Sequence, residues 1–188
     1  YQSEIREAQK NALSNNLWGI GADSWINELI DENSLTQEYL AALIDSYYGL
    51  WGAWTDSNSH GMWGIYVAKT RNEILIEDPI GGEIMTNKFF HPYLTYKARI
   101  DPNFNGNFSL RLDSSKPYTN HSQYLKDITL LGSNDISVSI NQLDNSITGN
   151  EGINTVILSG YSSEYVLNIS DNIASVIDKI PDRDGINI

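Results

Sequence analysis

The spacing of apolar residues changes near His91 and divides the chain into two halves. Before this point apolar residues recur every three or four positions, which is typical of amphipathic helices. After it they alternate with polar residues, and Asn, Ser and Thr become frequent, which is typical of strands and turns. The pattern predicts an α+β fold in which a helical subdomain, residues 1–92, packs on a β-rich subdomain, residues 93–188.

Capping residues set the predicted helix starts in the first half. Ser3 is placed to cap the first helix, and Ser34 with Gln37 has the sequence pattern of a capping box. Asp78 followed by Pro79 is a typical start for the last helix. The predicted helices cover about residues 4–15, 24–30, 35–51, 62–75 and 79–90.

In the second half, alternation predicts strands at residues 93–100, 108–113, 126–131, 155–159, 164–169 and 173–180. After the third of these strands, Val138, Ile147 and Val156 recur every nine positions, and Val156 lies in the fourth strand. The last of them lies in GNEGINTVI, Gly149 to Ile157. This segment is a full copy of the pattern G-[GN]-x-G-x-[DN]-x-U-x, in which U is a large apolar residue.

The nonapeptide resembles the hemolysin-type (RTX) calcium-binding repeat of secreted bacterial proteins, and VILSGYSSEYVLN followed by DRDG resembles the segment that closes an RTX array. The resemblance covers residues 132–188. It implies a short, degenerate β-roll-like coil, calcium in its turns, apolar U residues in its core, and a secreted, extracellular protein. Because the sixth positions are Ile136, Asn145 and Asn154 rather than Asp, we expect the coil to be mostly structural.

Two further resemblances concern the helical half. GADSWINELIDENSLTQEYLAALIDSYY, residues 21–48, resembles the short helical unit that often accompanies RTX repeats. REAQKNALSNNLW and TRNEILIEDPIGGEIMTNKFF, within residues 1–93, resemble the C-terminal helices of secreted zinc peptidases similar to anthrax lethal factor. The second resemblance implies an alternative function, that of a metallopeptidase fragment that lacks the zinc-binding helix.

Composition narrows the classes of partner. The chain has 24 acidic and 12 basic residues, a net charge of -12, which argues against a nucleic-acid partner and suits an extracellular or cation-binding protein. The absence of Cys excludes disulfides and thiolate zinc sites. No apolar run is long enough to span a bilayer. Because the chain starts at Tyr1 without a signal-like segment, we expect a piece of a longer protein or a mature form.

Three turns carry candidate calcium ligands. The first, DPNFNGN from Asp101, matches the opening of an EF-hand loop, although it lies between predicted strands and the bidentate acid position is displaced by one residue. An Asx-rich hairpin turn is the alternative interpretation. The second turn belongs to the nonapeptide region and the third is DRDG. The predicted metal ligands are Asp101, Asn103, Asn105, Asn107, Asp113, Asp144, Asn150, Asn154, Asp182 and Asp184.

The densest aromatic stretch lies between Tyr47 and Tyr66 and has two interpretations. Trp51, Trp54 and Trp63 could bind a glycan or a cell-surface partner, because aromatic platforms stack against sugar rings. Alternatively, the large rings and the interspersed glycines build a helical core. The sequence leaves both interpretations open.

The chain contains no complete catalytic motif. His60, His91 and His121 share no zinc-binding spacing, and neither a G-x-S-x-G motif nor a P-loop is present. We therefore expect a non-enzymatic, calcium-associated extracellular module that serves adhesion or scaffolding. Calcium is expected to stabilise the folded state alone, by neutralising part of the negative charge and holding turns that repel one another without it.

Overall fold

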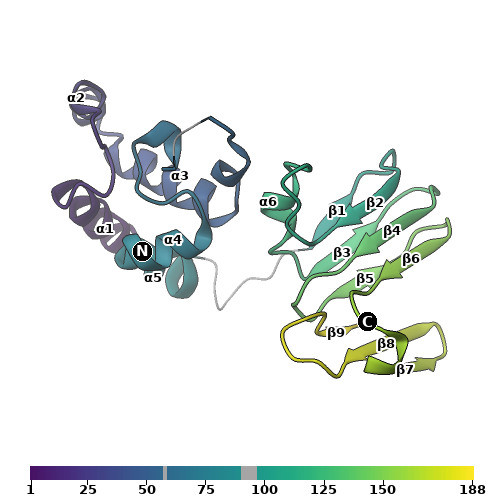
Figure 1. The fold of residues 1–188 in the computed structure, drawn as a ribbon. Helices are drawn as coiled ribbons and strands as arrows, with labels where there is room; N and C mark the ends of the chain where they lie inside the picture. The colour runs from purple at the N-terminus through teal and green to yellow at the C-terminus, as the bar shows by residue number, and fades with distance from the viewer. Residues whose placement is uncertain (57–58, 90–96) are drawn as a thin grey trace. The chain divides into compact units, whose positions relative to one another are not determined.

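The structure, a computed structural model, describes residues 1–56, 59–89 and 97–188. Helices fill the first half of the chain and strands the second, so the predicted α+β class is confirmed (Figure 1). The chain forms two compact units, Tyr1–Thr95 and Tyr96–Ile188. The boundary predicted between residues 92 and 93 falls outside the described residues. In the part that is described, no helix is long and apolar enough to cross a membrane.

The first unit is built from short helices. They are α1 (Gln2–Ser14), α2 (Asp23–Asp31), α3 (Leu35–Tyr47), α4 (Arg71–Glu77) and α5 (Pro79–Glu83), and α5 continues as a π-helical segment, Ile84–Phe89. Two 3₁₀ turns, Trp51–Ala53 and Met62–Gly64, lie between α3 and α4.

Several predicted helix boundaries are wrong. Ser3 lies inside α1 rather than before it, and the Ser34 hydroxyl, although it precedes α3, makes no capping bond. The predicted helix at 62–75 is interrupted because Trp63 has a left-handed φ of 54°. The helix begins instead after Thr70, whose hydroxyl and backbone N–H form a reciprocal capping box with Glu73.

The predicted start at Asp78 and Pro79 is confirmed. Pro79 occupies the first turn of α5, and the Asp78 carboxylate accepts the Gly81 N–H at 3.1 Å. The same carboxylate accepts hydrogen bonds from the Tyr39 hydroxyl at 2.6 Å and the Tyr66 hydroxyl at 3.1 Å, and Asp78 is fully buried. Asp78 therefore ties α3, α5 and the segment before α4 together.

Over its described residues, 97–188, the second unit contains nine strands and one short α-helix. The strands are β1 (Ala98–Ile100), β2 (Gly106–Ser109), β3 (Asp127–Leu130), β4 (Ile136–Ser139), β5 (Ser146–Thr148), β6 (Asn154–Ile157), β7 (Tyr165–Ser170), β8 (Ile173–Asp178) and β9 (Ile186–Asn187). The helix is α6 (Thr119–Ser122). β2 begins two residues before the predicted strand at 108–113, β4 and β5 fall between predicted strands, and β9 follows the last predicted one. The other observed strands overlap predicted strands.

Six of these strands wind into a flattened coil. β1, β3 and β5 form one parallel sheet, and β2, β4 and β6 form another, so each turn of the chain adds one strand to each sheet (Figure 1). Val138 is paired with Val156, 18 positions later, whereas Ile147 belongs to the other sheet and is paired with Ile128. The nine-residue recurrence in the sequence therefore reflects a chain that alternates between two sheets.

The core of this unit lies between the two sheets. It consists of Ile100, Leu110, Leu125, Ile128, Leu130, Ile136, Val138 and Ile140. Val138 is 1% exposed because strands flank it on both sides, whereas Val156, in the last strand of its sheet, is 42% exposed. The other sheet continues beyond β5, since the C-terminal residues return beside that strand.

Candidate functional site

The C-terminal segment brings Asn187 beside Asn145. The Asn145 N–H donates to the Ile186 carbonyl at 3.0 Å, and the Ile188 N–H donates to the Asn145 carbonyl at 3.0 Å. These bonds make Asn145 and Asn187 partners in a parallel bridge. Residues paired in this way present their side chains on the same face of the sheet, and both are buried, at 3% and 4% exposure.

Both amide groups leave an oxygen without a partner. The Asn145 Nδ2 donates to the carbonyls of Leu125 at 3.3 Å and Lys126 at 3.4 Å, and the Asn187 Nδ2 donates to the Asp184 carbonyl at 2.8 Å. These acceptors fix which end of each amide is nitrogen, because a flipped amide would place oxygen against oxygen. The two Oδ1 atoms are buried and have no hydrogen-bond partner. An unsatisfied buried acceptor costs about 1–3 kcal/mol.

Two predicted metal ligands flank this amide pair. Asp144 precedes Asn145, and its Oδ1 accepts the Ile186 N–H at 2.9 Å. Asp184 is buried, and its carboxylate accepts bonds from Arg111, the Tyr165 hydroxyl and the backbone and hydroxyl of Ser159. Burial raises the pKa of Asp184, but these donors outweigh it and the pKa lies below its usual value. Asp144 is thus adjacent to Asn145 in sequence and bonded to the residue before Asn187, whereas Asp184 anchors the β7–β8 region.

The DPNFNGN turn joins β1 to β2, and its predicted ligands have other partners. The Asp101 Oδ1 accepts the backbone N–H and the Nδ2 of Asn103 at 2.8 and 3.0 Å, which is an Asx turn. Asn107 bonds across to Ser139, and Asp113 accepts from Ser115. The structure therefore brings Asp101 and Asn103 together and engages Asn107 and Asp113 elsewhere. Asn105 is exposed in the same turn, and Asp182 is exposed in the DRDG turn.

In the nonapeptide, Asn150 and Asn154 bond to each other. Asn154 Nδ2 donates to Asn150 Oδ1, and Asn150 N–H donates to Asn154 Oδ1, both at 2.8 Å. The Asn150 Nδ2 also reaches the carbonyls of Leu131 at 3.1 Å and Asn134 at 3.0 Å, in the preceding turn of the coil. The Asn150 amide group therefore donates to carbonyl oxygens of the kind that would coordinate calcium in a metal-loaded turn.

A similar contact between an Asn amide and backbone carbonyls occurs in the preceding turn of the coil. The Asn134 Nδ2 donates to the carbonyls of Phe104 at 2.9 Å and Pro102 at 3.3 Å. Successive turns on this side of the coil are thus connected by Asn side chains. This leaves the Asn145–Asn187 pair, on the opposite turns, as the place in the described coil where amide oxygens are buried and unbonded.

Sequence reasoning identified Asp144 and named Asn145 as a sixth repeat position, but it missed Asn187. Asn187 lies outside the nonapeptide pattern, and no local signal links it to a residue 42 positions earlier. Its alternation with Ile186 and Ile188 indicates a strand, which was the one available clue.

The acidic and imidazole side chains do not gather into a metal site in the part of the chain that the structure describes. No group of three His, Asp or Glu residues is arranged to hold a metal among residues 1–56, 59–89 and 97–188. His91 lies outside these ranges, and His60 and His121 belong to different units. The alternative of a zinc metallopeptidase fragment stays a prediction.

The aromatic stretch divides between core and surface. Tyr47 and Tyr66 are buried, whereas Trp63 is 66% exposed. Trp51 contacts the rings of Trp54 and Trp63 edge to face, with centroids 5.8 and 5.0 Å apart. Trp63 and its neighbour Met62 both have left-handed φ angles, 54° and 47°, which are unfavourable for side chains of this size. The backbone thus holds a large ring outward at a conformational cost.

Comparison of the chain with models of protein families, with curated proteins and with solved structures found no match.

Proposed function

We propose that the chain is a calcium-associated extracellular module of a secreted, RTX-type bacterial protein, and that it serves adhesion or scaffolding. The observation that carries the calcium proposal is the pair of buried, unbonded oxygens, Asn145 Oδ1 and Asn187 Oδ1. Calcium binds oxygen ligands, including Asn side-chain carbonyls, at flexible geometry. The proposed ligands are these two oxygens together with the Asp144 carboxylate.

The coil supports the RTX assignment. The turn of the chain from β4 to β6 takes 18 residues, from Val138 to Val156, which is two nonapeptides, and the turn from β3 to β5 takes 19, from Ile128 to Ile147. The first turn is longer, because Phe108 is paired with Val138, 30 positions later, and α6 lies in the extra segment. The parallel sheets and the 18-residue turn that contains the nonapeptide are those that the resemblance implies.

The site suggests how calcium would act on folding. Asn145 and Asn187 become bridge partners only when the C-terminal segment lies beside β5, so the two residues are brought together in the folded chain and not in the unfolded one. A ligand that binds only the folded state stabilises it by about 2.7 kcal/mol at 100 times its dissociation constant. Calcium would therefore hold the C-terminus on the coil.

Calorimetry of the full chain tests this proposal. We expect the melting transition of the second unit to rise by several degrees in calcium relative to EGTA, and magnesium to produce a smaller shift because it requires a stricter octahedral geometry. All five Trp residues, at positions 18, 25, 51, 54 and 63, lie in the first unit, so Trp fluorescence separates its melting from that of the coil. An unchanged midpoint in calcium would overturn the proposal.

For adhesion, we propose Trp51, Trp54 and Trp63 as the contact surface. The support is the outward position of Trp63, which an interior packing role does not require. A glycan array probed with the folded chain tests this, with the triple Trp→Ala variant as control. Binding that is absent, or that persists in the variant, contradicts the assignment.

A further inference from the structure

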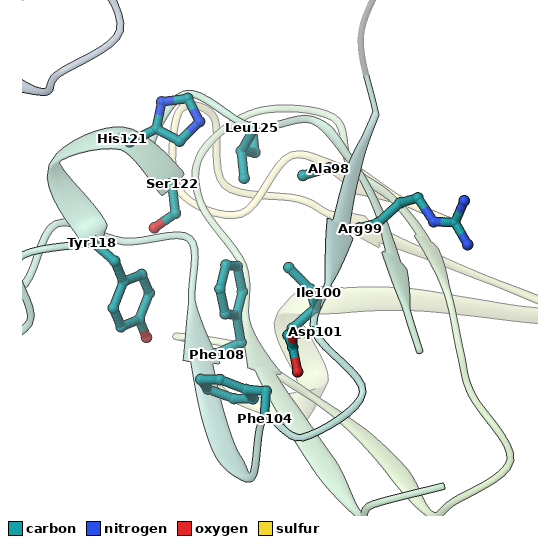
Figure 2. A pocket seen from close by; sticks show the side chains of 10 residues that line it. All are labelled: Ala98, Arg99, Ile100, Asp101, Phe104, Phe108, Tyr118, His121, Ser122 and Leu125. Atoms are coloured by element: carbon teal, nitrogen blue, oxygen red, sulfur yellow. The ribbon is translucent and has the colours of Figure 1, made fainter. Parts of the chain in front are cut away.

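A cavity of about 410 Å³ opens at the first turn of the coil (Figure 2). Its walls come from β1, the β1–β2 turn, β2 and the segment around α6. Small-molecule sites typically have volumes of about 300–1,000 Å³ and largely apolar walls with a few polar groups. The lining residues are Ala98, Arg99, Ile100, Asp101, Phe104, Phe108, Tyr118, His121, Ser122 and Leu125.

Three aromatic rings form one side of the cavity. Phe108 stacks on Tyr118 with centroids 5.1 Å apart and an interplanar angle of 21°, and Phe104 meets Phe108 edge to face at 5.5 Å. The Tyr118 hydroxyl accepts the Ser109 N–H at 3.0 Å, which fixes its ring against β2. The rings are therefore held in place before any ligand arrives.

The charged groups around the cavity differ in their position relative to the aromatic rings. In Figure 2 the Asp101 carboxylate lies on the side of Phe104 and Phe108, whereas the Arg99 guanidinium extends away from the rings. His121 lies at the opposite end of the cavity from Asp101. The Asp101 Oδ1 accepts two bonds from Asn103, and within the described residues its Oδ2 has no hydrogen-bond partner.

We propose that this cavity binds a small organic ammonium cation that carries methyl groups, such as a trimethylammonium group. Aromatic faces attract cations through the ring quadrupole, and the methyl groups suit the apolar walls formed by Ile100 and Leu125. Asp101 supplies the opposite charge. An organic anion is disfavoured by this carboxylate, and a strongly hydrated metal ion would lose its water against the rings.

The proposal is independent of the calcium site, which lies at Asn145 and Asn187. Its test therefore runs both in calcium and in EGTA, so that a loss of folding in EGTA is not mistaken for a loss of binding and failure of one proposal leaves the other untouched. Choline chloride is titrated into the isotope-labelled full chain and followed by NMR of the Phe and Tyr rings. The matched control ligand is 3,3-dimethylbutan-1-ol, which has the shape of choline without its charge.

We expect choline to shift the signals of Phe104, Phe108 and Tyr118 and to bind at least about fivefold more tightly than the neutral alcohol. Equal affinity of the two ligands would overturn the proposal, because the cavity would then select apolar shape alone. Absence of shifts at these rings with choline would overturn it as well.

Two variants locate the source of the selectivity. Asp101→Asn removes the charge and is expected to bring the affinity for choline down to that for the alcohol. Glu151→Gln, an equal loss of charge at an exposed position of another turn, is expected to leave choline binding unchanged. If Asp101→Asn binds choline as tightly as the wild type, Asp101 is not the recognition group and the proposal fails. The comparison of the two ligands on the wild-type chain remains decisive even if a variant does not fold.

Discussion

Asn145 and Asn187, 42 positions apart in the chain, lie side by side as bridge partners with both side-chain oxygens buried and unbonded. Elsewhere in the coil the buried Asn side chains are satisfied. Asn141, for example, donates to the carbonyls of Gln123 and Leu125 and accepts the Leu143 N–H at 3.0 Å. The contrast between these amides makes the calcium proposal testable by substitution.

Asn145→Asp should make the coil strongly dependent on calcium. Without the ion, the variant buries a carboxylate and loses the donors to Leu125 and Lys126, so its free energy of unfolding in EGTA should fall by about 2–3 kcal/mol. Calcium should recover most of this loss. Chemical denaturation in EGTA and in calcium measures both effects.

Asn141→Asp is the matched control for that experiment. Asn141 is also buried and also donates to two carbonyls, but its oxygen already has a partner. The control should be destabilised to a similar extent and should not recover in calcium. Equal recovery in both variants would show that calcium binds elsewhere.

Tyr39→Phe should destabilise the helical unit more than Tyr66→Phe. The Tyr39 hydroxyl donates to Asp78 Oδ2 at 2.6 Å and the Tyr66 hydroxyl donates to the same atom at 3.1 Å. Hydrogen bonds to charged groups contribute about 1.5–3 kcal/mol, so we expect the first substitution to reach this range and the second to fall below it. Urea unfolding followed by Trp fluorescence provides the measurement, and the reverse order would contradict the geometry.

The helical unit should lose stability at alkaline pH. Burial, together with the Asp78 charge, raises the pKa of Tyr39 and of Tyr66 well above the ordinary value of about 10. The unfolded chain therefore releases these protons while the folded chain retains them, so the free energy of unfolding falls as pH rises above about 10. Tyr66→Phe should flatten this dependence in urea titrations at pH 9 to 11. If the free energy of unfolding of the variant falls with pH as steeply as that of the wild type, this prediction is wrong.

The second unit should lose stability in acid through Arg183. Bonds from Arg183 lower the pKa of Asp178 and of Glu164 below their usual values. Their contribution is present above about pH 4 and is lost as pH falls through the folded-state pKa values. We expect Arg183→Gln to melt at a lower temperature at neutral pH and to change less than the wild type between pH 5 and 3. Parallel acid dependence in the two proteins would refute this assignment.

Gly152→Ala should destabilise the nonapeptide turn. A Cβ at this position would lie 2.5 Å from the Asn134 carbonyl oxygen in the preceding turn, so the stacked turns would have to separate. Overpacking of this kind typically costs about 1–3 kcal/mol. Glu151→Ala, at the exposed neighbouring position, should change stability by less than about 0.5 kcal/mol. Thermal unfolding of the two variants, followed by far-UV circular dichroism, separates a steric effect at Gly152 from a general effect on the turn.

Local sequence signals predicted helix boundaries correctly where a single segment determines the structure. Asp78 and Pro79 start a helix because the carboxylate and the fixed proline φ act within one turn. The pattern failed at residues 62–75, where Met62 and Trp63 adopt left-handed conformations that their side chains disfavour. Tyr66 and Met62 are buried in the core of this unit, and such packing can override the local preference.

The candidate sites required more than local signals. Asp144 was predicted from its turn, but Asn187 becomes part of a candidate site only when the C-terminal segment returns beside β5. Phe104, Phe108 and Tyr118 come from different segments and meet because the long first turn folds α6 against β2. No spacing rule connects these residues.

The sequence by itself determined the order of helices before strands and the nine-residue alternation, since both follow from the periodicity of neighbouring side chains. Tertiary structure alone decided which amide oxygens are buried without partners and which rings enclose a cavity. The physical reason is that periodicity acts within a turn or a strand, whereas burial and hydrogen-bond satisfaction depend on segments that chain folding brings together from far apart.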